Sequence, residues 1–411
     1  MRILYLCHRF PYPPRRGGKI RPFNMIRHLA GSHEVTVLSL VRSAEEAREA
    51  EGIAGHCHRF QMFRVHDPVQ ALRMVARLPT PVPSSFGYFY SARLAATVRA
   101  LALRDAFDLV FVHCSSVARY VQSITRVPKI LDFGDMDSQK WKDYARERRW
   151  PLAAGYALEG AKLEREEARL ARRFDLCTAT TRAEWQTLEG FRTGTATDWF
   201  PNGVDTDYFA PDGTAHDPDQ IVFVGRMDYF PNQLAMQSFC ADVLPALRQR
   251  RPATCLTIVG ADPPPSIRRL GERPGVTVTG SVPDVRPYLV RAALMVAPLA
   301  IARGTQNKIL EGMAAGVPVV ASDIAGGGID ATAPEHLLTA FDPAGYLEAI
   351  IRILESPAER ARLAHAGRAR MLSHHAWPQS MRRLDGIVER CVTHWRPAQP
   401  LQFSRHGGRT T

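Results

Sequence analysis

The sequence predicts an α/β protein built from two doubly wound halves. Short apolar runs rich in Val, Ile and Leu alternate with helix-length amphipathic segments along nearly the whole chain. Such runs, without polar alternation, are typical of strands buried on both faces of a parallel sheet, and the helices between them complete βαβ units. The regularity breaks at 201–205 and 210–219, which are rich in Pro, Gly and Asp and therefore predict a linker.

The expected strands fall into two series, one on each side of this linker. The first comprises Arg2–Cys7, Val35–Val41, Arg59–Val65, Asp108–His113, Lys129–Phe133 and Leu176–Thr180. The second comprises Ile221–Gly225, Cys255–Gly260, Val276–Thr279, Leu294–Pro298, Val317–Ser322 and Leu337–Phe341. We therefore expect one domain at 1–205 and a second at 206–375. A helix at 376–395 is expected to brace the two domains, and 396–411 is expected to be a flexible tail.

Charge is distributed unevenly along the chain. The 411 residues are 45% apolar and 23% charged, which excludes a disordered protein, and the net charge is +12. Residues 1–129 hold 19 Lys and Arg against 8 Asp and Glu, whereas the remainder is almost neutral. A basic first third favours an anionic partner: nucleic acid, an acidic membrane or a phosphorylated substrate.

Cysteine usage and hydropathy point to the cytosol. The seven cysteines are widely spaced and form no Cys-x-x-Cys pair, so neither a disulfide framework nor a zinc site is indicated. The first apolar run is too short for a signal peptide, and no stretch approaches 18 consecutive apolar residues. We expect a cytoplasmic protein that is able to lie against a membrane.

In open parallel sheets, ligands bind beyond the carboxyl ends of the strands, so the loops at those ends carry the candidate site. After the first strand, Gly17 and Gly18 permit close approach to the start of a helix expected near Ile20–Ala30, and a helix N-terminus favours an anion. Arg15 and Arg16 add positive charge. The alternative is a Pro/Gly turn with a solvated basic face.

Two further candidates follow strands of the first half. His113 ends a buried strand where a cleft would lie, but for a lone histidine the more common alternative is a core side chain bonded to backbone. Asp135 and Asp137 imitate an Asp-x-Asp metal pattern. They also suit the cap of a helix beginning near Ser138, and we favour capping or acceptor contact over a metal.

The second half offers two phosphate-binding patterns. Gly225 permits close approach and Arg226 supplies a planar fork for phosphate, the alternative being a surface pair with Asp228. Further along, Thr305 is expected to cap a helix that closes at Gly316.

Lys308 and Glu311 share one face of that helix. Lys308 would lie in the first turn, where a phosphate docks, and Glu311 one turn deeper, where a ribose diol would be held. The alternative is an ion pair between positions i and i+3.

These motifs, in this order, resemble the family-4 glycosyltransferases of the GT-B fold. The resemblance rests on the Gly-Gly loop, Pro201-Asn-Gly-Val-Asp205, Phe223-Val-Gly-Arg226 and the run from Lys308 to Val320, and it extends to about Trp395. It implies two Rossmann-like domains and retaining transfer of a sugar from a nucleotide sugar, without a metal or other cofactor. Segments 135–142 and 225–232 look most like a bacterial subgroup found with exopolysaccharide and exosortase (PEP-CTERM) loci.

The resemblance also implies roles for individual residues. Gly17 and Gly18 would meet the donor diphosphate or the acceptor, and His113 would contact the transferred sugar. Arg226 would neutralise the leaving diphosphate, and Glu311 would bind the nucleotide ribose. The catalytic set is then His113, Arg226 and Lys308, and the acceptor side comprises Asp135, Asp137, Arg15 and Arg16.

The chain departs from the family pattern at two places. Arg303 stands eight residues before Glu311, where the family often has glutamate, and Met227–Ala235 contains no lysine. Our hypothesis is that Lys308 replaces the missing charge on the diphosphate. Arg303 and the backbone N–H groups of Gly304 and Thr305 would complete the donor site.

Three function classes remain open from the sequence. A glycosyltransferase acting by front-face substitution is favoured over a sugar-nucleotide 2-epimerase and over a non-catalytic GT-B module that binds polyanions. The expected partners are a nucleotide-sugar donor and a glycan or lipid-diphosphate-linked acceptor, and no nucleic acid. Basic and aromatic segments at 69–78 and 86–90 suit the anionic inner membrane leaflet, the alternative being a core helix with solvated arginines.

Overall fold

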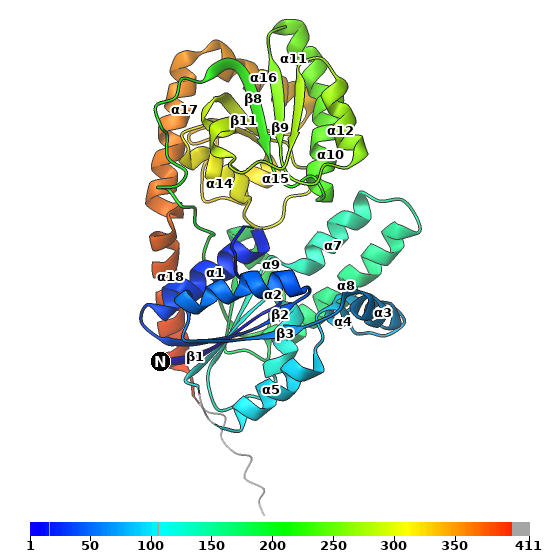
Figure 1. Ribbon diagram of the computed structural model, residues 1–411, viewed down its shortest axis with the longest axis vertical. Coiled ribbons are helices and arrows are strands. Elements are labelled where there is room, and N and C mark those ends of the chain that lie inside the picture. Colours follow the sequence, from blue (N-terminus) through cyan, green and yellow to red (C-terminus); the bar gives the residue numbers. More distant parts are fainter. Residues whose placement is uncertain (16, 105–106, 397–411) are drawn as a thin grey trace, which may run out of the picture.

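The computed structural model describes residues 1–15, 17–104 and 107–396 and shows two α/β domains stacked along the longest axis of the molecule (Figure 1). The first sheet has the order β3 (Arg59–Arg64), β2 (Glu34–Val41), β1 (Arg2–Cys7), β4 (Leu109–His113), β5 (Lys129–Gly134), β6 (Leu176–Ala179), β7 (Ala196–Trp199). The second has the order β10 (Val276–Gly280), β9 (Cys255–Val259), β8 (Asp217–Val224), β11 (Ala292–Ala297), β12 (Val319–Ser322), β13 (Leu338–Ala340). All of these strands pair in parallel, which confirms the predicted fold class.

Helices connect the strands and cover both sheets. Those of the first domain are α1 (Gly17–Ala30), α2 (Ala44–Ala50), η1 (Glu51–His56), α3 (Asp67–Ala76), α4 (Ser84–Tyr88), α5 (Ala92–Ala102), α6 (Ser115–Ala118), η2 (Arg119–Val121), α7 (Asp137–Arg146), α8 (Leu152–Ala171) and α9 (Arg182–Gly190). The second domain contains α10 (Phe230–Ser238), η3 (Phe239–Val243), α11 (Leu244–Arg250), α12 (Pro265–Arg268), η4 (Arg269–Glu272), α13 (Arg286–Val290), α14 (Asn307–Ala314), α15 (Asp323–Gly326), α16 (Pro343–Glu355), α17 (Pro357–Arg370) and η5 (Met371–His375). The last helix is α18 (Trp377–His394).

Full burial of the central strands explains the unbroken apolar runs of the sequence. Every residue of β4, β5 and β11 is buried, because helices cover both faces of each sheet. All the strands expected from the sequence are present, with ends that differ by a few residues. The structure adds β7, an edge strand whose sequence Ala-Thr-Asp-Trp is half-buried and lacks an apolar run.

The chain crosses between the domains twice, and the two crossings lie side by side. Val204 donates its backbone N–H to the carbonyl of His375, and the His375 ring bonds to the carbonyl of Asn202 (Nδ1 to O, 3.1 Å). After the second crossing, α18 runs along the first domain (red in Figure 1). Its side chains Trp377 and Leu384 join the buried cluster of β1 and β4.

The described chain ends at Arg396, just after α18. Of the expected tail 396–411, Arg396 alone lies within the described residues. Within the described ranges, every helix is either too short or too polar to cross a membrane.

Candidate functional site

The loops that follow the strands of one domain touch those of the other. Asn202 donates a hydrogen bond to Asn307 (Nδ2 to Oδ1, 3.1 Å), and a Cβ on Gly17 would lie 3.9 Å from Nδ2 of Asn307. In both sheets the strand order reverses at the centre, between β1 and β4 and between β8 and β11. The carboxyl ends at such switch points form ligand crevices, so the candidate site lies where the two meet.

Two helix N-termini meet in this region. Helix α1 begins at Gly17, and α14 begins at Asn307, which touches Gly17. A Cβ on Gly18 would have open space around it. Free N–H groups and the helix dipole make each terminus attractive to an anion, and two facing termini reinforce one another.

The cap of α14 differs from the prediction. Gln306, not Thr305, is the N-cap residue, and no side chain caps the helix. Because the helix begins two residues after Thr305, the hydroxyl of Thr305 is not at the cap position, and it is buried without a hydrogen-bond partner among the described residues. The helix closes before Gly316 (φ 72°), as predicted.

Lys308 lies in the first turn of α14 and reaches back over β8. Its ammonium donates to Asn232 (Nζ to Oδ1, 2.6 Å) and sits 4.5 Å above the ring of Phe223. Burial lowers the pKa of Lys308 to about 7, although the charge of Glu311 opposes the shift. Burial likewise raises the pKa of Glu311 to about 7. Lys308 thus bonds to an amide rather than forming the simple ion pair that was the alternative.

Gly225 makes this arrangement of Lys308 possible. A Cβ at Gly225 would lie 2.9 Å from Nζ of Lys308 and 2.8 Å from Nδ2 of Asn232. Asn232 also donates to the carbonyl of Arg226 (2.7 Å), which fixes its side chain. The Gly-Arg motif and the lysine of α14 therefore form one assembly at the end of β8.

Arg226 occupies the predicted place but is already paired. Its guanidinium donates to Asp228 (Nε to Oδ1, 3.0 Å; Nη2 to Oδ2, 2.8 Å) and also to Asp262. These carboxylates raise the pKa of Arg226. The ion pair with Asp228 is the alternative that the sequence left open, and a ligand anion would compete with both carboxylates for this fork.

His113 is held by a buried charge network. Its Nδ1 lies 2.7 Å from Oδ2 of Asp132, which is fully buried and is paired in register with His113 across β4 and β5. Arg21 grips the same carboxylate with two bonds of 3.0 Å, and Thr178 donates to it at 2.9 Å. Against its own burial, Arg21 and His113 hold the pKa of Asp132 far below its usual range. The carboxylate fixes the ring with Nδ1 protonated and Nε2 as the free nitrogen.

The backbone next to His113 is strained. Cys114 has φ 83° and ψ 133°, a backbone conformation that residues other than glycine rarely adopt and that costs about 1–3 kcal/mol. The ring of His8, which directly follows β1, lies 6.0 Å from that of His113, and its Nδ1 is buried without a hydrogen-bond partner among the residues that the structure describes. Burial lowers the pKa of His8 well below its ordinary value, so this ring stays neutral beside His113.

The two aspartates expected to cap a helix do not do so. Helix α7 has Met136 at its N-cap position, and its N-terminal N–H groups go to Glu184 (Met136 N to Oε2, 2.7 Å) and Glu167 (Ser138 N to Oε1, 3.0 Å). These glutamates from α9 and α8 pack against the end of the helix and take the capping role. Asp137 pairs with Lys140 at 3.0 Å.

Asp135 faces the second domain. It accepts a bond from Thr180 (2.9 Å), and burial raises its pKa. A Cβ on Gly304 would overlap its carboxylate, at 1.7 Å from Oδ1, so Gly304 is required for this approach of the two domains.

Glu167 makes the stability of the protein depend on pH. Burial raises its pKa to about 8, and its Oε2 has no hydrogen-bond partner in the described parts of the chain. The folded state therefore holds a proton that the unfolded state releases near pH 4.5, and this contribution to stability is lost as the pH rises toward 8. Glu167→Gln keeps an acceptor for Ser138 but cannot ionise.

We expect Glu167→Gln to melt at a higher temperature than wild type at pH 9, by a few degrees, and to match it closely at pH 5. Thermal melts across pH 5–9 measure the difference. Glu164→Gln is the matched control, since this half-exposed neighbour on α8 pairs with Lys142. Parallel curves for wild type and Glu167→Gln would show that the buried carboxyl does not titrate in this range.

Arg303 is not directed at the donor site as expected. Its guanidinium crosses to α7 and pairs with Asp143 (Nε to Oδ2, 2.6 Å), with Glu184 3.8 Å away. The positive side chain of Arg303 pairs with carboxylates of the first domain and so bridges the two domains.

The sequence predicts an acceptor-side role for the two arginines before Gly17. Arg15 is exposed on the loop after β1, and Arg16 lies outside the described residues.

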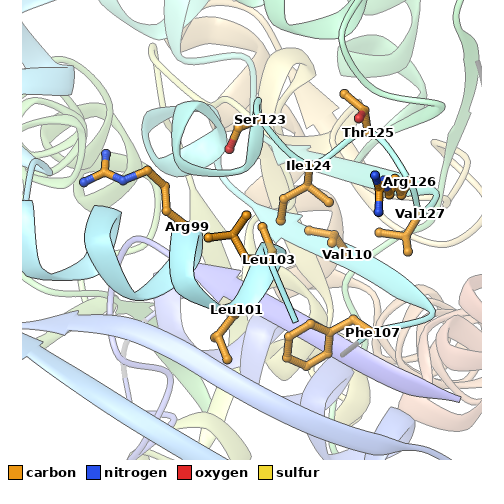
Figure 2. A pocket seen from close by; sticks show the side chains of 11 residues that line it. Arg99, Leu101, Leu103, Phe107, Val110, Ser123, Ile124, Thr125, Arg126 and Val127 are labelled. Atoms are coloured by element: carbon orange, nitrogen blue, oxygen red, sulfur yellow. The ribbon is translucent and has the colours of Figure 1, made fainter. Parts of the chain in front are cut away.

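Two cavities lie away from the helix termini. A cavity of about 410 Å³ is lined by apolar side chains of the first domain, among them Leu101, Phe107 and Val110 (Figure 2). It adjoins the start of β4, opposite His113, and so does not belong to the candidate site. A cavity of about 720 Å³ adjoins the ends of β9 and β10 and includes Asp262, the partner of Arg226. No group of three or more metal-ligating side chains occurs within the described parts of the chain.

Sequence reasoning missed the residues that hold the candidates in place. Asp132 lies in β5, three residues before Asp135. Its partner Arg21 lies 111 positions away in the sequence, so the sequence did not show the pair. Asn232 lies six residues after Arg226. In the sequence, only its polar character near the start of an expected helix could have indicated its role.

Comparison with known proteins finds similarity to one protein family and to several solved structures. Residues 218–356 match the family described as glycosyl transferases group 1. No curated protein sequence matches the chain. Many solved structures match the chain, several of them over nearly its whole length, and because their identities are low, they establish the GT-B fold rather than an activity.

Sucrose-phosphate synthase from Thermosynechococcus elongatus is similar with a TM-score of 0.69 and 16% identity, over 96% of this chain and 100% of the other. Anabaena HepE in complex with UDP gives 0.68 and 15%, over 95% and 100%. TarM, which a second structure assigns to S. aureus, gives 0.70 and 10%, over 94% and 98%.

Proposed function

We propose that this protein is a glycosyltransferase that moves a sugar from a nucleotide sugar to an acceptor with retention of configuration. The observation that carries the proposal is the convergence of Lys308 with the N-termini of α1 and α14. Breaking a glycosyl–diphosphate bond leaves negative charge on the diphosphate. Positive groups already fixed around that position stabilise the charge as it develops.

The remaining residues take roles that follow from their places. His113, held by Asp132, would present Nε2 to the transferred sugar. Glu311, one turn below Lys308, would bind the ribose diol, and the cavity beside Asp262 would take the base. The acceptor hydroxyl would attack from the face that the diphosphate leaves, and its proton would pass to the leaving diphosphate oxygen.

In this proposal no metal or other cofactor is needed, since Lys308 and the helix termini supply the positive charge. The measurement is turnover with and without EDTA. Equal rates are expected, and loss of activity restored by a divalent cation would contradict this part.

The donor is identified first by a thermal-shift screen with UDP, GDP and ADP sugars. A donor that binds the folded state stabilises it by about 3 kcal/mol at a hundredfold excess over Kd, and the melting temperature rises as a result. Uridine donors are tested first, because HepE was solved with UDP-glucose. No shift with any nucleotide sugar would contradict the proposal.

Product analysis separates the competing functions. Transfer requires an acceptor and releases nucleoside diphosphate. A sugar-nucleotide 2-epimerase would convert the donor alone, and a polyanion-binding module would turn over nothing. In Glu311→Ala, the rate is expected to fall strongly, and an unchanged rate would refute the assignment of the nucleotide site.

For the acceptor, we propose a lipid-diphosphate-linked glycan at the cytoplasmic face of an anionic membrane, in bacterial exopolysaccharide synthesis. Support comes from α3 and the turn that follows it, where Val69, Leu72, Val75 and Leu78 form a stripe of residues that are between 47% and 70% exposed. In this helix only Gln70 is buried. An exposed apolar stripe beside arginines suits the boundary of an anionic bilayer.

Vesicle flotation tests the membrane contact. Wild-type protein is expected to float with vesicles that contain phosphatidylglycerol and to be released by salt. Leu72→Ser together with Val75→Ser should abolish flotation while donor binding persists. Flotation that is unaffected by these changes would contradict the role of α3.

A further inference from the structure

A second basic site lies in the first domain, beside the reaction centre. A cavity of about 400 Å³ between α4, α5 and η2 is lined by three arginines and by aromatic side chains. We call it the arginine pocket. Its lining includes the arginines Arg77, Arg99 and Arg119 and the aromatic residues Phe89, Tyr90 and Tyr120.

Positive charge in the arginine pocket is poorly compensated. Arg119 pairs with Glu166 (Nη2 to Oε2, 2.8 Å). The side chains of Arg77 and Arg99 form no hydrogen bond or ion pair with any residue that the structure describes. Burial, and then the charge of Arg119, lowers the pKa of Arg77, which means that these cations repel one another. A multivalent anion would relieve this repulsion.

The aromatic side chains give the pocket a fixed shape. The rings of Tyr90 and Tyr120 are stacked with centroids 6.3 Å apart. The Tyr120 hydroxyl donates to the carbonyl of Phe89 (2.9 Å) and accepts from Ser91 N (2.6 Å). Helices α3 and α4 are tied to α8, since Lys162 donates to the carbonyl of Leu78 (2.7 Å) and Glu159 accepts from Ser84 N (2.9 Å). The arginines are thus held apart around a cavity, not packed into a core.

The pocket shares a wall with the reaction centre. Phe89 lines the pocket and packs its ring edge-on against His8, with centroids 5.2 Å apart. His8 in turn lies 6.0 Å from His113. Figure 2 shows the guanidinium of Arg99 extending away from Leu101 and Phe107, the residues of the neighbouring apolar cavity. A ligand that spans from Arg77 to His113 would carry its anionic group in the pocket and its reactive group at the centre.

We propose that the arginine pocket binds the phosphate or diphosphate group of the acceptor. The guanidinium forks of Arg77 and Arg99 match the several oxygens of a phosphate, the charge of Arg119 lies beside them, and 400 Å³ accommodates a small organic phosphate. This proposal rests on the proposed glycosyl transfer and deepens it. The phosphate belongs either to a soluble sugar phosphate or to a lipid diphosphate, and the test distinguishes the two.

The test is calorimetric titration with inorganic pyrophosphate, glucose 6-phosphate and farnesyl diphosphate. The donor site is first saturated with the nucleotide diphosphate that the donor screen selects. Arg77→Met and Arg99→Met are each expected to weaken binding of at least one probe by about ten- to a hundredfold. Arg77→Lys should restore part of the affinity. Arg93→Met, an exposed arginine on α5 outside the pocket, is the matched control.

Each result has a definite meaning. Tightest binding by farnesyl diphosphate supports a lipid-linked acceptor, and tightest binding by glucose 6-phosphate supports a soluble one. Equal affinities for all three probes in wild type and in both arginine variants would overturn the pocket. If the nucleotide binds normally in that case, the proposed glycosyl transfer still stands. If no nucleotide binds at all, the proposed function fails, and titration without nucleotide still tests the pocket.

Discussion

Replacing Asp132 by asparagine is expected to lower the melting temperature by about 10 °C and turnover by about a hundredfold. The stability loss follows because Arg21, which is buried, would lose the only carboxylate that it contacts among the described residues. Removing one partner of a buried ion pair costs about 3–5 kcal/mol. The loss of turnover follows because an amide no longer fixes His113 with Nδ1 protonated.

Two measurements separate these effects. Thermal melts give the stability, and ¹⁵N spectra of the histidine ring give its tautomer. Thr178→Val is the matched control, since it removes one bond to the same carboxylate (2.9 Å) and leaves the charge network intact. Asp132 acts through His113, so it is a positioning residue. An Asp132→Asn protein with an unchanged tautomer and normal turnover would refute that role.

Replacing Lys308 by methionine is expected to weaken donor binding and turnover together by about 10²–10³-fold. Methionine keeps the stem of the side chain over Phe223, and only the charge and the bond to Asn232 are lost. Because burial lowers the pKa of Lys308 to about 7, its charge is present below that pH and is lost above it. Donor affinity of the wild type should therefore fall as the pH rises above 7, and the variant should lack this dependence.

The matched control for Lys308 is Lys129→Met. Lys129 is also buried and lies 5.6 Å above an aromatic ring, that of Phe174, but it stands at the amino end of β5 in the first domain's sheet. Its pKa is also lowered by burial. Kinetics and nucleotide titration at pH 6 and pH 8.5 compare the three proteins. Equal donor affinity in Lys308→Met and wild type would refute the hypothesis that Lys308 replaces the family's missing lysine.

The fold was predictable because its signal is local. Buried parallel strands such as β4 and β11 need continuous apolar runs, and these are visible in any short window of the sequence. The edge strand β7 was missed, since Thr197 and Asp198 carry no such signal. The positions of Gly17, His113 and Lys308 at strand and helix ends were predictable for the same reason.

The partners of the site residues were not predictable, because they come from distant parts of the chain. Arg303 finds Asp143 across 160 positions, and Asn202 finds Asn307 across 105. No periodicity encodes such pairs. Thr305 and Arg226 show a second limit of prediction from local sequence. Local propensity allows Thr305 to cap a helix and Arg226 to present a free guanidinium, but in the folded protein Thr305 caps nothing and Arg226 pairs with Asp228.

Helix α18 has a consequence for how the molecule is made. The apolar side chains of this last helix complete the core of the first domain, where Trp377, Met381 and Ile387 lie against strands from the first third of the chain. During synthesis, these residues leave the ribosome only after the whole second domain has been made. The first domain therefore has to wait, with one face of its sheet uncovered, until the second domain has been made. The order of synthesis and the order of folding therefore differ for the first domain, which is not a self-sufficient folding unit without α18.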